Sequence, residues 1–323
     1  MVKIDIISGF LGAGKTTLIK KLLKDGFQGE QVVLIENEFG EIGIDGGFLK
    51  EAGIQIREMN SGCICCSLVG DFGTSLKEVV TKYNPDRILI EPSGVGKLSD
   101  VIKAVQGVQD EVDIKLNSYT TVVDAKKCKM YMKNFGEFFD NQIQYAGAII
   151  MSRTDIASEK KVQESLELLR SLNKDAAIIT TPIENLDGKK LVEVMEHPVS
   201  LEQEMLEEEH EHHHHHDGEC GCGHDHHHHH ADEVFTSWGR ETIKKYTREG
   251  LENILEALSE SDKYGIILRA KGMLPAEDGT WIYFDMVPEE TEIREGAPEY
   301  TGRLCVIGSK LDEHALEELF GIA

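Results

Sequence analysis

Residues 9–17 read Gly-Phe-Leu-Gly-Ala-Gly-Lys-Thr-Thr, and they directly follow Lys3–Ser8, a short isoleucine-rich run. The pattern G-x-x-x-x-G-K-[ST] between a strand and a helix predicts a loop whose backbone N–H groups surround phosphate oxygens. We expect the helix to cover Lys15–Lys24. Lys15 should reach the β- and γ-phosphates, and the Thr16 hydroxyl should bind Mg²⁺. The loop therefore predicts a site for a nucleoside triphosphate with Mg²⁺.

Downstream of this loop, apolar runs alternate with amphipathic stretches up to residue 197. This alternation predicts an α/β fold of the P-loop NTPase kind, with a mostly parallel sheet and helices on both faces. The expected strands are Lys3–Ser8, Val32–Glu36, Ile54–Glu58, Arg87–Ile90, Tyr119–Val123, Ala148–Met151 and Ala177–Thr181. The expected helices after the first are Phe72–Tyr83, Asp100–Gly107, Asn134–Tyr145, Ser158–Asn173 and Asp187–Met195.

Two of these strands lead into acidic residues. Glu36 closes one strand, and Glu91 follows another in the sequence Glu-Pro-Ser-Gly. The carboxyl ends of parallel strands are where such sheets bind ligands. We expect Glu91 to act in catalysis by holding Mg²⁺ or its water, and the N–H of Gly94 to sense the γ-phosphate.

The sequence Ser152-Arg153-Thr154-Asp155 follows a later strand. It stands where GTPases carry Asn-Lys-x-Asp, whose aspartate accepts hydrogen bonds that only guanine can donate. Asp155 is the expected reader of the base, and the stem of Arg153 the expected cover over it. This favours GTP, with ATP as the alternative, because serine replaces asparagine at the first position.

Three thiols lie within four residues at Cys63-Ile64-Cys65-Cys66. A closed structural zinc site needs four N or S ligands, usually as two separated pairs, and a disulfide between such near neighbours closes almost no loop. We interpret the cluster as an open site that holds a metal temporarily. Thiolate ligands favour zinc, with cobalt or nickel as alternatives.

The composition changes at residues 198–231, which contain nine Asp or Glu and no Lys or Arg. Such a segment cannot form a packed core, so we expect a disordered linker. Its two histidine runs, interrupted by Cys-Gly-Cys, favour a metal-collecting arm over an expression tag. The ligands proposed from this arm are His212, His213, His214, Cys220, Cys222, His226 and His227.

Residues 232–323 form a second predicted unit. Strands are expected at Val234–Trp238, Gly265–Lys271, Thr280–Val287 and Arg303–Ile307, and helices at Gly250–Glu260 and Asp312–Phe320 with Asp312 as N-cap. Because strands and helices are segregated, this is a smaller α+β domain. The predicted domains are therefore 1–197, 198–231 and 232–323. The isolated Cys128 and Cys305 are expected to be buried apolar residues.

The charge balance narrows the classes of partner. With 34 Lys and Arg against 58 Asp and Glu, the formal net charge is −24. This disfavours nucleic acid and anionic membranes as partners. No signal peptide and no apolar run long enough to span a bilayer is evident, and the unspaced cysteines fit reduced thiols, so we expect a cytoplasmic protein.

The quoted motifs together resemble the CobW family of metal-handling P-loop GTPases, which is related to the UreG and HypB metallochaperones. The resemblance covers nearly the whole chain and implies a CobW-like C-terminal domain. It implies that Cys63, Cys65 and Cys66 form a C-x-C-C metal site with Glu36 nearby, and that Asp155 reads guanine. The implied phosphate and Mg²⁺ ligands are Gly12, Ala13, Gly14, Lys15, Thr16 and Thr17.

This reading predicts a GTPase that binds a transition metal and delivers it to a client metalloprotein under control of the nucleotide. Its oligomeric state stays open between a monomer and a nucleotide-dependent dimer. Two alternatives use the same residues differently. One is a metal store that relies on the His/Cys arm, and the other is a redox-sensing assembly factor whose adjacent thiols oxidise.

Overall fold

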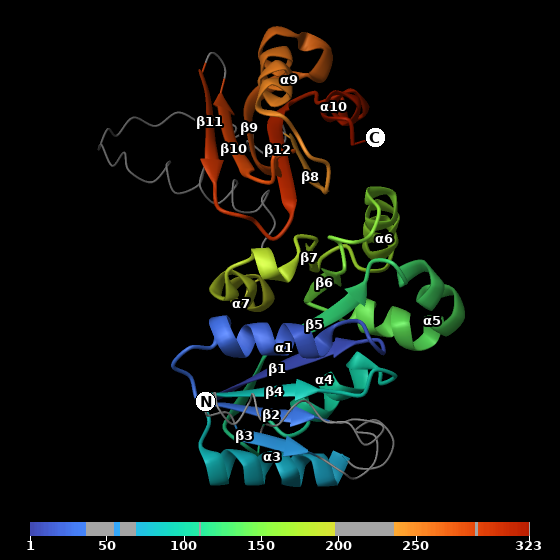
Figure 1. Ribbon diagram of the computed structural model, residues 1–323, viewed down its shortest axis with the longest axis vertical. Coiled ribbons are helices and arrows are strands. Elements are labelled where there is room, and N and C mark those ends of the chain that lie inside the picture. Colours follow the sequence, from blue (N-terminus) through green and yellow to red (C-terminus); the bar gives the residue numbers. More distant parts are fainter. Residues whose placement is uncertain (37–54, 59–68, 110, 198–235, 288–289, 323) are drawn as a thin grey trace, which may run out of the picture. The chain divides into compact units, whose positions relative to one another are not determined.

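The computed structural model describes residues 1–36, 55–58, 69–109, 111–197, 236–287 and 290–322. It separates into two compact units, Met1–Pro198 and Val199–Ala323, each of which is described by itself (Figure 1). Within these ranges no helix is long and apolar enough to cross a membrane.

The first unit is built on a seven-stranded sheet in the order β3-β2-β4-β1-β5-β6-β7. Every pairing between these strands is parallel, and both faces of β2 and β4 are buried throughout. This confirms the predicted parallel sheet. Its strands are β1 (Val2–Gly9), β2 (Val32–Glu36), β3 (Gln55–Glu58), β4 (Arg87–Glu91), β5 (Ile114–Asp124), β6 (Ala148–Ser152) and β7 (Ala177–Ile179).

Helices cover both faces of this sheet. One group, consisting of α1, the π-helix η1 and α7, packs together, while α3, α4, α5 and α6 pack as a row of neighbours (Figure 1). Right-handed crossovers require this division, because the chain moves outward from β1 in opposite directions along the sheet. The bounds are α1 (Lys15–Lys21), η1 (Leu22–Gly26), α3 (Val69–Tyr83), α4 (Leu98–Gln106), α5 (Cys128–Gln144), α6 (Glu159–Leu172), η2 (Ile183–Asn185) and α7 (Gly188–Glu196).

Two elements of this unit begin at least five residues earlier than the sequence predicts. Helix α5 begins at Cys128 rather than Asn134, and its backbone leaves helical geometry at Phe135 (φ −137°, ψ 28°). This break interrupts the 3.6-residue periodicity, so the first turns do not continue the pattern of the last ones. Strand β5 begins at Ile114 because its polar residues Asn117 and Ser118 bond the buried carboxylate of Asp5.

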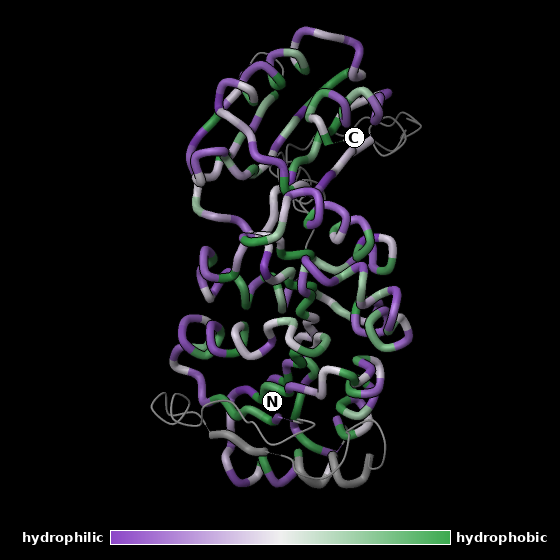
Figure 2. Tube along the Cα trace, turned by 45° about the vertical axis from the view of Figure 1, so that its right-hand side comes forward, coloured by the Kyte–Doolittle hydropathy of each residue, from purple (hydrophilic) through white to green (hydrophobic). Residues whose placement is uncertain are grey.

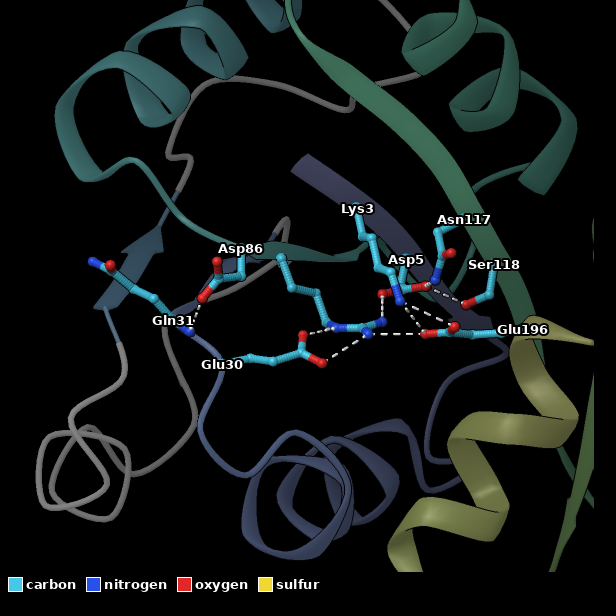
Figure 3. A network of polar contacts seen from close by, with 9 residues as sticks. Lys3, Asp5, Glu30, Gln31, Asp86, Asn117, Ser118 and Glu196 are labelled. Atoms are coloured by element: carbon cyan, nitrogen blue, oxygen red, sulfur yellow. Dashed lines mark hydrogen bonds and ion pairs between the residues drawn. The ribbon is translucent and has the colours of Figure 1, made fainter. Parts of the chain in front are cut away.

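A network of charged residues lies at the amino ends of the strands (Figure 3). The guanidinium of Arg87, only 1% exposed, pairs with Asp5, with Glu30 at 2.6 Å and with Glu196 at 2.8 Å. Glu196 also pairs with Lys3 at 3.2 Å. Burial alone would lower the pKa of Arg87, but its bonds to Glu30, Asp5 and Glu196 outweigh that effect and raise it.

The second unit is an antiparallel sheet in the order β11-β10-β9-β12-β8. Helices α9 and α10 contribute to one core with Trp238, Leu274 and Phe284, and Asp312 caps α10 by accepting from the N–H of Ala315. The predicted α+β unit and its N-cap are confirmed. Its bounds are β8 (Thr236–Thr242), α9 (Arg248–Glu260), η4 (Asp262–Tyr264), β9 (Ile266–Pro275), β10 (Trp281–Val287), β11 (Glu290–Gly296), β12 (Gly302–Ser309) and α10 (Glu313–Phe320).

Strand β11 is absent from the sequence-based prediction. It reads ETEIREG, with four charged residues, and it is the edge strand next to β10. Charged side chains are common on edge strands because they discourage pairing with other chains, and they also remove the alternation that identifies a strand.

The hydropathy of the chain matches this architecture. Figure 2 shows hydrophobic stretches along the central strands and a mixture of both kinds of residue along the surrounding helices. Cys128 and Cys305 are both buried, as expected. Burial raises the pKa of the Cys128 thiol to about 11, so this residue stays neutral near pH 7.

Candidate nucleotide and metal site

The loop between β1 and α1 has the backbone that the phosphate-binding pattern requires. Gly14 precedes the first helical residue with φ 109°, a conformation that favours glycine. The loop also packs closely against the segment after β4, because a Cβ on Gly94 would lie 2.9 Å from the N of Leu11. The two predicted phosphate-sensing segments, around Gly12 and around Gly94, are therefore adjacent.

Lys15 begins α1 and is held inside the site. Its side chain is 10% exposed, and its Nζ donates to the Gly9 carbonyl at 3.1 Å and lies 3.7 Å from Glu91 Oε1. These contacts hold the ammonium at the start of the helix, where the dipole of α1 adds positive potential. An anionic group of several oxygens is what such a cation and helix terminus attract.

Glu36 and Glu91 stand side by side at the carboxyl edge of the sheet. They are directly paired residues of β2 and β4, and they are 4% and 5% exposed. Two carboxylates held this close in a buried position favour a cation between or beside them. Their carboxylate oxygens, like the hydroxyl of the half-buried Thr16, are the kind of donor that Mg²⁺ prefers.

The segment after β6 supports the phosphate loop from the side. Ser152 Oγ donates to the Ala13 carbonyl at 2.5 Å, and Arg153 Nη2 donates to the Gly12 carbonyl at 2.9 Å. Arg153 also pairs with Asp124, the buried last residue of β5. Sequence reasoning missed this bracing role of Ser152 and Asp124. The only available signal was that Asp124 directly follows a predicted strand. Polar residues follow other predicted strands too, so this position did not distinguish Asp124.

The remaining predicted ligands of the nucleotide are placed as follows. Ala13 is buried, Gly14 and Thr16 are half-buried, and Gly12 and Thr17 are exposed. Asp155 is exposed, two residues beyond Arg153. An exposed carboxylate after a strand that borders the phosphate loop is accessible to a base.

The predicted transition-metal ligands fall mostly outside the described residues. These are Cys63, Cys65, Cys66, His212, His213, His214, Cys220, Cys222, His226 and His227. Among the residues that the structure does describe, no group of three or more His, Cys, Asp or Glu is arranged to hold a metal ion. The chain leaves β3 at Glu58, paired with Glu36, and Cys63 follows five residues later.

Comparisons with known proteins agree with these features. Residues 3–180 match the family model described as CobW/HypB/UreG, nucleotide-binding domain, and residues 235–322 match the Cobalamin synthesis protein cobW C-terminal domain. The first match covers more than half of the chain. The family resemblance expected from the sequence is thereby confirmed.

Individual relatives are more distant. The chain is 29% identical over 191 residues to "Zinc chaperone YeiR" of Escherichia coli (strain K12), a match covering 59% of this chain and 58% of that relative. The matched stretch thus spans little more than half the length of that relative. The chain is also 24% identical over 325 residues to "Zinc-regulated GTPase metalloprotein activator 1" of Schizosaccharomyces pombe (strain 972 / ATCC 24843), covering 90% of this chain and 76% of the other.

Among solved structures, the Zn(II)-bound YjiA GTPase from E. coli is similar with a TM-score of 0.44 and 21% sequence identity. The alignment covers 99% of this chain and 98% of that one.

Proposed function

Because the chain belongs to the CobW/HypB/UreG family, we propose that it is a GTP-hydrolysing metallochaperone that delivers a transition metal to a client metalloprotein. The relatives named as zinc chaperones support zinc as the cargo, with cobalt or nickel as alternatives. The proposed cargo ligands are Cys63, Cys65 and Cys66, with Glu36 beside them.

The observation that carries this proposal is the arrangement of Lys15, Glu36 and Glu91 at one edge of the sheet. Lys15 is within 3.7 Å of Glu91, which pairs with Glu36. Lys15 would bind the phosphates of GTP, and Mg²⁺, when bound by Thr16 and a carboxylate, would neutralise the charge that develops on them. Water attacks the γ-phosphate, and GDP and inorganic phosphate leave.

Glu36 would couple the nucleotide state to the bound transition metal. It belongs to the strand end that borders the phosphate site, and it is also paired with Glu58, the last described residue before the thiols. A change in the order of this edge on hydrolysis would alter the ligands available to the metal and favour its release. Nucleotide and metal should then affect each other's affinity reciprocally.

Base selection is proposed to rest on Asp155, with Ser152 and Arg153 supporting the loop. Their bonds to Ala13 and Gly12 hold the phosphate loop and the base-reading segment in a fixed position relative to each other. GTP is favoured over ATP because a carboxylate that accepts from guanine has no equivalent donor on adenine.

A metal titration tests the proposal. Zn²⁺ and Co²⁺ are titrated into the chain with a non-hydrolysable GTP analogue, with GDP and without nucleotide, using a variant that lacks Glu209–His230 so that the histidines do not obscure the result. We expect tighter binding with the GTP analogue, and loss of that binding in Cys65→Ala/Cys66→Ala with nucleotide affinity retained. Equal metal affinities in all three states would contradict nucleotide control.

A further inference from the structure

One side of the phosphate loop carries an unusual number of exposed apolar side chains. Leu11, Val95, Met130, Phe135 and Phe138 are 56%, 38%, 47%, 45% and 39% exposed. They come from the phosphate loop, from the segment after β4 and from α5. We call these five residues the apolar flank.

Contacts show that the three segments meet. The Phe135 ring lies 5.0 Å from that of Phe10, and the Tyr131 hydroxyl donates to the Leu11 carbonyl at 3.5 Å. Gly94, which directly precedes Val95, packs against Leu11. The three segments that carry the apolar flank therefore meet beside the nucleotide loop. Large side chains of this kind gather at the surface mainly where another molecule covers them.

The surroundings of the apolar flank are basic, although the chain as a whole is strongly acidic. Residues 126–133 read KKCKMYMK, with four lysines and no acidic residue, in a chain of net charge −24. Lys126, Lys127 and Lys133 are exposed and form no ion pair with any carboxylate that the structure describes. Lys127 Nζ lies 5.9 Å from the Tyr131 ring. By contrast, Lys97, beside the Phe138 ring, pairs with Glu137, and Lys129 pairs with Glu164, so Lys126, Lys127 and Lys133 supply the positive charge.

We propose that the apolar flank and its lysines form a docking surface for an acidic segment of a partner protein that also carries large apolar side chains. Charge complementarity selects this occupant. A second copy docked face to face would bring the two sets of lysines together, which is unfavourable. Nucleic acid carries about one negative charge per 1.7 Å of duplex, a far higher charge density than an acidic peptide, so a chain of net charge −24 repels it much more strongly. The surface does not require metal transfer, so the inference goes beyond the proposed function.

A fluorescent peptide tests the surface on the full-length chain. The probe is a synthetic helical peptide with Leu and Phe on one face and Glu on the other, and binding is followed by anisotropy at low and high salt. Two control peptides carry Lys in place of Glu, or Ser in place of Leu and Phe. We expect only the acidic apolar peptide to bind, more weakly at high salt.

Variants locate the binding. Met130→Ser/Phe138→Ser should weaken it at least about tenfold, as loss of central apolar anchors does. Lys127→Glu/Lys133→Glu should weaken it by about three- to tenfold and abolish its salt dependence. Tyr145→Ser and Lys174→Glu, which change exposed residues elsewhere on the same unit, should have no effect. Nucleotide affinity measured on every variant shows that the fold is retained.

Three outcomes would overturn the proposal. The first is equal binding of all three peptides, or equal binding by all the folded variants. The second is self-association in sedimentation experiments that Phe138→Ser removes, which would assign the surface to a second copy. The third is binding that occurs only after residues 198–231 are replaced by a Gly/Ser linker, which would identify the chain's own acidic segment as the occupant.

Discussion

Buried charge differs between the two ends of the parallel strands in the N-terminal sheet, here called the amino edge and the carboxyl edge. At the amino edge, Arg87 is bonded by Asp5, Glu30 and Glu196, and Asp5 accepts further bonds from Asn117 at 2.8 Å and Ser118 at 2.6 Å. At the carboxyl edge, the buried carboxylates of Glu36 and Glu91 lie beside each other, with Lys15 3.7 Å from Glu91. At the amino edge, charged side chains bond one another. The arrangement at the carboxyl edge suits ligands that carry charge.

Because of this difference, we expect the amino edge to stabilise the fold and the carboxyl edge to bind ligands. A buried ion network that is fully bonded holds strands in place but offers no site to a ligand. Two adjacent buried carboxylates at strand ends that border the phosphate loop are placed where a bound cation would stabilise them. Substitutions at the amino edge should therefore change folding, and substitutions at the carboxyl edge should change ligand binding and turnover.

The largest expected effect is at Arg87. Arg87→Met leaves the buried carboxylate of Asp5 without its cation and leaves Glu196 with Lys3 alone, which should cost about 3–5 kcal/mol of unfolding free energy. The melting temperature of this unit should fall by about 6–20 °C, as measured by calorimetry or circular dichroism. Lys129→Met, which breaks an exposed pair with Glu164 at 3.7 Å in the same unit, is the control and should change stability by less than about 0.5 kcal/mol.

Lys15→Ala should produce the next largest effect. It should destabilise the fold less than Arg87→Met, because Glu91 lies 3.7 Å from the Lys15 ammonium, whereas three carboxylates bond Arg87 at shorter distances. Loss of the phosphate-binding cation should lower the rate of GTP hydrolysis by about 10²–10³-fold, measured by phosphate release. Lys24→Ala, at an exposed position after α1, should hydrolyse GTP at the normal rate. A Lys15→Ala chain that unfolds like Arg87→Met would contradict the separation between the two edges.

Acid should weaken the amino edge when Glu196 becomes protonated. Burial would raise the pKa of Glu196, but its hydrogen bonds with Arg87, Asn117 and Lys3 outweigh burial and lower it. The stability that this carboxylate contributes is therefore fully present above its unfolded pKa of about 4.3 and is lost as the pH falls through the lowered value.

Urea unfolding measured from pH 7 to pH 3 checks this dependence. Glu196→Gln should lose about 1.5 kcal/mol at pH 7 and should show a shallower decline in acid, because its amide does not titrate. An unchanged acid slope in this variant would show that other carboxylates carry the dependence.

The smallest expected effect is at the support of the phosphate loop. Ser152→Ala removes the hydrogen bond to the Ala13 carbonyl and should weaken GTP binding by about fivefold, equivalent to about 1 kcal/mol. Ser171→Ala is the control, because it removes a comparable hydroxyl bond to the Leu168 carbonyl on the exposed side of α6. Calorimetric titration with GTP and with ATP measures both the loss and the base preference.

Sequence patterns could predict the sheet and the strand-end position of Glu36 and Glu91, because each depends on a local run of buried residues. They could also predict the N-cap at Asp312, which needs only the residues that follow it. They did not predict that Glu36 and Glu91 are direct neighbours. That requires the strand order, in which β4 lies between β2 and β1, and strand order depends on contacts between segments far apart in the chain.

The features that the sequence did not predict all depend on neighbours that are distant in the chain. Asn117 and Ser118 have low strand propensity, and only the distant Asp5 explains their place in β5. The charges of β11 are acceptable because it is an edge strand. Ser152 reads as a departure from a motif until the bond to Ala13 shows what it does.

The central position of β1 also affects how the protein is made. This strand and the phosphate loop are synthesised before β4 and β5, with which β1 pairs, and β5 ends only at Asp124. At translation rates of about 5–20 residues per second, the loop waits on the order of 5–20 s for its supporting strands. During that interval Ile4, Ile6 and Ile7, all fully buried in the finished sheet, have no partners to pack against. We therefore expect the nascent chain to need protection from aggregation before GTP can stabilise it.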